Sequence, residues 1–111
     1  MALPGFLPDR CQFQYPFRKP DGGGGFETVY KDAFPQRGKL IMETGRERLQ
    51  AGRLESAFAG RLRIKASAQA RTIEASWRVI VNGIVHKILT VDNSDARSMW
   101  IFLTVERGSG S

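Results

Sequence analysis

The sequence has very few of the residues on which most enzyme and metal sites depend. It contains one cysteine, Cys11, and one histidine, His86. A single cysteine excludes a disulfide within the chain and fits a reducing compartment. A usual zinc site takes about four nitrogen or sulfur ligands, which these two residues cannot supply. We therefore expect no bound metal and no cofactor.

Long apolar runs are also missing. A membrane-spanning helix needs roughly 18 or more consecutive apolar residues, and no segment approaches that length. The first ten residues, MALPGFLPDR, lack the basic start and the apolar core of a secretory signal. We expect neither a membrane span nor a signal peptide.

One pair of residues and two segments could suggest a functional motif, but each lacks residues or spacing that the motif requires. The spacing of Cys11 and His86 gives no sign of a nucleophile with its base. The glycine run Gly22–Gly25 lacks the lysine and hydroxyl residue that complete a phosphate-binding loop. Asp92–Asp95 begins like a calcium loop, but Arg97 stands where that loop requires glycine. The sequence therefore predicts no catalytic residue.

What the chain does have is an excess of positive charge. Its 111 residues include 17 basic and 11 acidic side chains, which give a net charge of +6 and a pI of about 10.1. This balance favours an anionic partner: nucleic acid, an acidic membrane surface or an acidic protein. The length predicts one domain over residues 1–108. Residues 109–111 continue a Gly-Ser stretch and are expected to form a flexible tail.

Alternating apolar residues predict strands through the first two-thirds of the chain. Glycine and proline mark the breaks between them, and we expect Pro35 to close the second strand. Lys19–Gly25 is expected to be a mobile loop, and Gly45–Ser56 a loop or short helix. The predicted strands are Arg10–Phe17, Phe26–Phe34, Arg37–Thr44 and Ala57–Ala66.

Asn82-Gly83 is the clearest local signal, because this pair favours a two-residue hairpin turn. Such a turn fixes the register of the two strands. One face then carries the opposed pairs Val81–Ile84, Val79–His86 and Trp77–Ile88, and the other carries Ile80–Val85 and Arg78–Lys87. His86 lies on the apolar face, so a packed histidine is the first interpretation and a functional one the second.

The last strand, Met99–Glu106, is apolar on both faces, which indicates a central strand or one buried in a subunit interface. Six or seven short strands and little helix predict an all-β fold. We expect a small antiparallel β-barrel or sandwich with long loops.

The basic residues are the main candidates for partner contacts. Their long stems can also cover apolar surface while the charged ends stay in water, so both interpretations stay open. Gly22–Gly25 is likewise either a flexible hairpin tip or a loop that orders on assembly. Candidates for DNA or acidic-partner contacts are Arg61, Arg63, Lys65, Arg78 and Lys87; candidates for interface or channel loops are Gly22, Gly23, Gly24, Gly25, Arg46, Arg48 and Arg53.

The order of several segments resembles that of tailed-phage head–tail joining proteins, also called head-completion or stopper proteins. These segments are DGGGGFETVYKDAF, GRE, RLRIKA, WRVIVNGIVHKILTVDN and FLTVER, and they run from Asp21 to Arg107. The hairpin that leads into the VDN turn carries most of the resemblance. The longer glycine run and the proline-rich arm before the first strand depart from the family layout.

The resemblance implies a structural subunit and no catalysis. The expected partners are copies of the chain in a ring, portal and adaptor ring proteins, tail terminator or tail tube proteins, and double-stranded DNA in the channel. Such a ring belongs to the virion neck, is assembled in the bacterial cytoplasm, and would equally suit a gene transfer agent. The alternative from a different class is a small oligonucleotide-binding β-barrel, which would use the basic strand at Arg61–Lys65.

Overall fold

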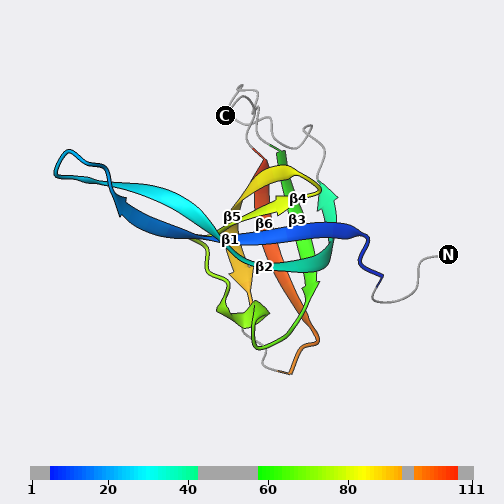
Figure 1. The fold of residues 1–111 in the computed structure, drawn as a ribbon. Coiled ribbons are helices and arrows are strands. Elements are labelled where there is room, and N and C mark those ends of the chain that lie inside the picture. Colours follow the sequence, from blue (N-terminus) through cyan, green and yellow to red (C-terminus); the bar gives the residue numbers. More distant parts are fainter. Residues whose placement is uncertain (1–5, 43–57, 94–96, 108–111) are drawn as a thin grey trace, which may run out of the picture.

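The computed structural model describes residues 6–42, 58–93 and 97–107. These residues form six strands and one 3₁₀ turn (Figure 1). The strands are β1 (Asp9–Pro20), β2 (Phe26–Met42), β3 (Phe58–Lys65), β4 (Arg78–Val81), β5 (Ile84–Asp92) and β6 (Trp100–Arg107), and the turn η2 (Ala70–Thr72) lies between β3 and β4.

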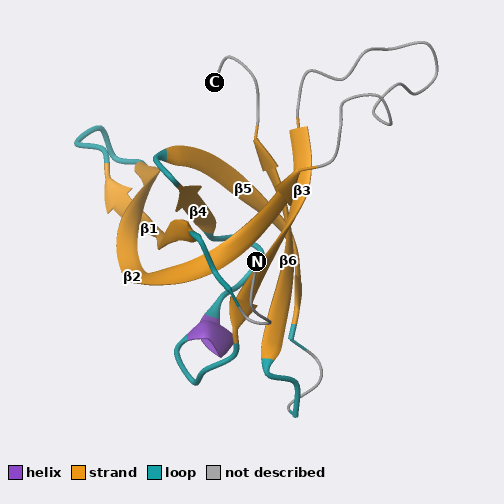
Figure 2. Cartoon of the chain, turned by 90° about the vertical axis from the view of Figure 1, so that its right-hand side faces the viewer, coloured by secondary structure: helices purple, strands orange, loops and turns teal. Residues whose placement is uncertain are grey.

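The strands close into a barrel in the order β1-β2-β3-β6-β5-β4, with β4 paired back to β1. Every neighbouring pair is antiparallel. The all-β prediction is confirmed, and the arrangement is a barrel rather than a sandwich. Both views place η2 at the lower end of this barrel (Figures 1 and 2).

One face of each strand fills the barrel, as the period of two along a strand requires. On β6, Ile101, Leu103 and Val105 are buried, and they alternate with half-buried neighbours. The strand pairs with β3 on one side and β5 on the other, which confirms its predicted central position. The rest of the core comprises Cys11, Phe13, Phe34, Leu62, Ile64, Ala70, Ile73, Val79, Val81 and Ile88.

The predicted hairpin is present as β4 and β5. Asn82 and Gly83 both adopt positive φ angles, 51° and 87°, as this type of turn requires. The register matches the prediction from Arg78↔Lys87 to Val81↔Ile84. The predicted Trp77–Ile88 pair lies outside this register, because β4 begins at Arg78. Ile84, at the other end of the same face, is 43% exposed.

The prediction that Pro35 closes a strand is wrong. The two segments expected as Phe26–Phe34 and Arg37–Thr44 form the single strand β2, in which Pro35 lies opposite Gln12. Pairing of β2 with β3 begins only at Gly38. At Pro35 the strand therefore has a neighbour on one side only, where a missing N–H group need not break a ladder.

The first strand is also longer than predicted. β1 continues through Pro16 to Pro20, although β4 pairs only with Cys11–Gln14. From residue 15 onward, β1 and β2 leave the barrel as a two-stranded ribbon, here defined as residues 15–31 (Figure 1). Phe17 is 41% exposed because it lies on this ribbon.

Gly38 lies where β2 passes between β1 and β3, with Asp9 and Ile64 as its partners. A Cβ atom at this position would come within 3.0 Å of Leu62 Cδ1 and 3.1 Å of the Arg63 carbonyl oxygen. Only glycine fits there without displacing the neighbouring strand.

Replacing Gly38 with alanine should therefore lower the free energy of unfolding by about 1–3 kcal/mol. Gly23→Ala is the matched control, because a Cβ at Gly23 meets only Asp21 Oδ1 at 3.6 Å. That control should change stability by less than about 0.5 kcal/mol. Urea denaturation of both variants checks this, and equal stabilities would contradict the tight packing of β2 on β3.

His86 is packed in the core, as its first interpretation stated. It is 2% exposed, and Nδ1 lies 2.8 Å from the Ile84 carbonyl oxygen, to which the Nδ1–H group donates. Burial lowers the pKa of His86 below its ordinary value of 6.5, and the Arg107 cation acts in the same direction. The folded protein therefore holds this imidazole neutral at pH values where the unfolded chain binds a proton.

The free energy of unfolding should consequently fall as the pH drops below about 6.5, by at most about 1.4 kcal/mol per pH unit from this group. Urea denaturation at pH 7.5 and pH 5.5 measures the loss. His86→Leu should flatten the profile in this window. Because the chain has one histidine, NMR of its ring protons gives the pKa directly, and a value at or above 6.5 would contradict the explanation.

Candidate functional site

The glycine run lies at the tip of the ribbon, where the structure shows a defined turn. The backbone N–H groups of Gly23 and Gly25 donate to Asp21 Oδ1, at 2.8 and 3.1 Å. These bonds lower the pKa of Asp21. Gly22 and Gly24 adopt φ angles of 86° and 88°, which other residues rarely accept. The predicted mobile loop is thus shorter than expected, since Lys19 and Pro20 belong to β1.

The ribbon exposes aromatic side chains without a core beneath them. Phe17 and Phe26 are 41% and 59% exposed, and Tyr30 is 36% exposed. A cation lies over each of these rings. Lys31 Nζ is 3.8 Å from the centre of Phe17, and the Arg18 guanidinium is 4.9 Å from that of Phe26. The cation over Tyr30 is Arg78. Such contacts shield apolar surface where no second sheet is available.

The outer face of β3 carries the predicted row of Arg61, Arg63 and Lys65, while Leu62 and Ile64 point into the core. Two of these cations lie over aromatic rings of β6. The Arg61 guanidinium is 5.3 Å from the centre of Phe102, and that of Arg63 is 4.4 Å from a ring of Trp100. The alternation predicted from sequence is confirmed.

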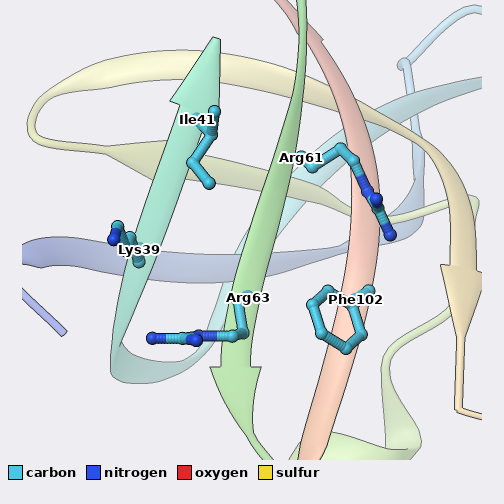
Figure 3. Close-up of a pocket in the computed structure, with 5 residues that line it drawn as sticks. All are labelled: Lys39, Ile41, Arg61, Arg63 and Phe102. Atoms are coloured by element: carbon cyan, nitrogen blue, oxygen red, sulfur yellow. The ribbon is translucent and has the colours of Figure 1, made fainter. Parts of the chain in front are cut away.

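Arg61 and Arg63 share a pocket of about 130 Å³ with residues of two neighbouring strands. Figure 3 shows its lining, with Arg61 extending across β6 beside Phe102. Lys39 and Ile41 of β2 complete the pocket. Sequence analysis missed Lys39. Its position opposite Arg63 depends on the register between β2 and β3, and no short turn in the sequence sets that register.

Arg78 belongs to a different surface and is held by its own protein. Its Nε–H group donates to Gln14 Oε1 at 2.7 Å, and Gln14 Nε2 donates to Asp32 Oδ1 at 2.7 Å. The guanidinium also lies 4.1 Å from the centre of the Tyr30 ring. These contacts offset the repulsion between Arg78 and Lys87, which are direct cross-strand partners. On its other side, Lys87 is paired with Glu106.

The structure therefore separates the basic candidates into two places. Arg61 and Arg63 line one pocket, whereas Arg78 and Lys87 line another beside Tyr30, Trp77 and Val85. Lys65 shares the β3 face but does not line either pocket. The candidates Arg46, Arg48 and Arg53 fall outside the described residues.

Cys11, which begins the barrel part of β1, is a poor nucleophile. The side chain is 3% exposed, and burial, with the Asp9 carboxylate, raises the pKa of the thiol to about 12. It therefore stays protonated, whereas a reactive cysteine acts as its thiolate. Among the residues that the structure describes, no cluster of three or more potential metal ligands occurs. The same residues include no helix of the length and apolarity that crossing a membrane takes.

The fold is similar to that of other proteins of known structure. A chain in the virion of a native gene transfer agent particle superposes with a TM-score of 0.69 and 16% sequence identity, over 92% of this chain and 94% of that one. Protein SF1141 from Shigella flexneri 2a superposes with a TM-score of 0.69 and 20% identity, over 96% and 97%. At these identities the likeness is one of fold.

Sequence comparison identifies the family. None of the curated proteins matches the chain. The family model for the phage head completion protein matches residues 3–108, which is almost the whole sequence and includes every strand described above. The resemblance carried by the Asn82-Gly83 hairpin and the segments around it is thereby confirmed, and the chain belongs to the phage head completion protein family.

Proposed function

We propose that the chain is a head-closure subunit, a connector protein that seals the DNA-filled head below the portal and adaptor and offers a docking surface to the tail. The observation that carries this proposal is the family match over residues 3–108. Phage head completion proteins are structural rather than enzymatic. The fold shared with a gene transfer agent virion chain makes a phage-derived particle an equally suitable setting.

A ring of identical subunits needs two different surfaces on each copy, one for each neighbour. The barrel is closed by the β1–β4 pair, so it has no free edge strand among those that the structure describes. Within the described residues, the ribbon is where β1 and β2 each lack a second neighbour. We therefore assign the ribbon to one side of the subunit interface.

The composition of the ribbon supports this assignment. Two-stranded ribbons are at best marginally stable alone in water, and this one exposes Phe17, Phe26 and Tyr30. Packing against a neighbouring subunit would bury those rings and pair an open strand edge. Arg78 and Lys87, at the base of the ribbon beside Tyr30, would then face the channel DNA or an acidic face of an adjacent ring.

The rival function, a free oligonucleotide-binding barrel, finds less support. Such proteins stack bases on exposed aromatic rings within a basic groove. Here the rings of Phe17, Phe26 and Tyr30 each have a cation over one face. Trp100 and Phe102, beside the basic strand, are covered in the same way. The cations that would have to bind the phosphate backbone of a nucleic acid thus already cover the rings on which its bases would stack.

A completion assay tests the proposal. Purified protein is added to DNA-filled heads that lack it, and DNA retention and tail attachment are scored. The wild-type chain should restore both. Failure, with heads shown to be competent by a control extract, would overturn the head-closure role.

The same assay tests the ribbon tip. Residues 21–25 are replaced by Asn-Gly, which joins the directly opposed Pro20 and Phe26 through a two-residue turn. Thermal unfolding should be unchanged, because the tip has no contact with the core. Completion should fall at least about tenfold, the loss expected when about 1.4 kcal/mol of contact energy disappears. Full completion by the shortened chain would remove the tip from the interface.

A further inference from the structure

The pocket between β2, β3 and β6 brings three cations, Lys39, Arg61 and Arg63, together in its lining. Lys39 and Arg63 are direct cross-strand partners, and Arg61 lies two residues along the same face. Like charges in opposed positions destabilise a sheet. Lys39, Ile41, Arg61, Arg63 and Phe102 line the pocket, and none of them is acidic. The arrangement is stabilised if an anion enters from outside.

Arg63 adds a second and independent sign of a missing ligand. Its Nε atom is buried and has no hydrogen-bond partner in the described part of the chain. A buried donor left without an acceptor costs stability, and a charged donor costs more. The guanidinium carbon lies 4.4 Å from the centre of a Trp100 ring, and this contact restricts the movement of the side chain. A planar, oriented guanidinium is suited to two-point binding of a carboxylate or phosphate.

The surroundings of the cations distinguish between these two anions. Ile41 forms one wall of the pocket and is 58% exposed, and Phe102 forms another. Phosphate contacts along DNA gain nothing from such apolar walls. A protein segment gains from them, since its apolar side chain can cover Ile41 while its acidic side chain meets the guanidinium groups. Arginine and aromatic residues together are also typical of the centres of protein interfaces.

We propose that this pocket binds an aspartate or glutamate side chain of a partner protein, presented next to an apolar residue. The site is distinct from the ribbon and gives the subunit a second docking surface. Naming the partner as a neighbour in the connector rests on the proposed function, whereas the binding chemistry rests on the pocket alone.

NMR of the isolated protein tests the binding chemistry. The chain has two tryptophans, so the Trp100 indole signal reports on the pocket and the Trp77 signal is an internal control. The probe is the peptide acetyl-Leu-Glu-Leu-Glu-Leu-amide, and the matched control peptide has glutamine in place of glutamate. The acidic peptide should shift the Trp100 signal saturably and leave that of Trp77 in place. The glutamine peptide should bind at least about tenfold more weakly.

Variants locate the effect. Arg63→Gln should weaken binding of the acidic peptide at least about tenfold. Lys19→Gln removes one positive charge from the end of β1 on the ribbon, outside the pocket lining, and should change the affinity less than about twofold. The signal dispersion of each variant verifies that it is folded, and the comparison of the two peptides on wild-type protein stands without any variant.

Three results would overturn the proposal: equal binding of the glutamate and glutamine peptides, no saturable change at Trp100, or tighter binding of inorganic phosphate or a short DNA duplex than of the acidic peptide. The last result would assign the pocket to DNA. These outcomes are separable from the head-closure role. Failure of the wild-type protein to complete heads would leave peptide binding unchanged, and loss of peptide binding would leave the completion assay of the wild-type protein unaffected.

Discussion

The closure of the barrel through a short pairing of β1 with β4 is the constraint on which the rest of the structure depends. Only Cys11–Gln14 pairs with β4. The Asn82 side chain strengthens this junction: its Oδ1 accepts from the Arg10 N–H group, and its Nδ2 donates to Asp9 Oδ1. At the other end of the pairing, Gln14 links Arg78 to Asp32. Both ends are therefore held by side chains, which compensates for the few backbone bonds available between them.

Because the closure is so short, it divides β1 and β2 into an inner and an outer part. The inner part contributes Phe13 and Phe34 to the core, where their ring centres lie 5.3 Å apart. The outer part lies beyond β4 and has no sheet to pack on, so its aromatic rings are covered by Arg18, Lys31 and Arg78 instead. The register shift between Phe13 and Gln14 marks the boundary. Bulges of this kind bend a strand and increase its twist, which is how the same two strands serve both barrel and ribbon.

The features that sequence analysis predicted correctly are those set by neighbouring residues. The Asn82-Gly83 turn fixed the register of its hairpin, and the period-two pattern around Leu62 separated the core face from the basic face. Features set by distant segments were missed. The continuation of β2 through Pro35 depends on where β3 begins to pair, and the opposition of Lys39 to Arg63 depends on the same pairing. Neither carries a local signal, since a proline ordinarily indicates the end of a strand.

The placement of the cations distinguishes two kinds of positive charge in a chain with a net charge of +6. A mobile lysine in water attracts any anion and loses that attraction as salt rises. A guanidinium stacked on a ring has lost much of its freedom before any ligand arrives, so less entropy is lost when it binds. Its direction is also fixed, which favours an acceptor at one position over a diffuse charge. Arg63 on Trp100 and Arg78 on Tyr30 are both of this kind. Arginine side chains held over surface aromatic rings are thus oriented donors, and such donors suit docking on another protein better than sliding along DNA.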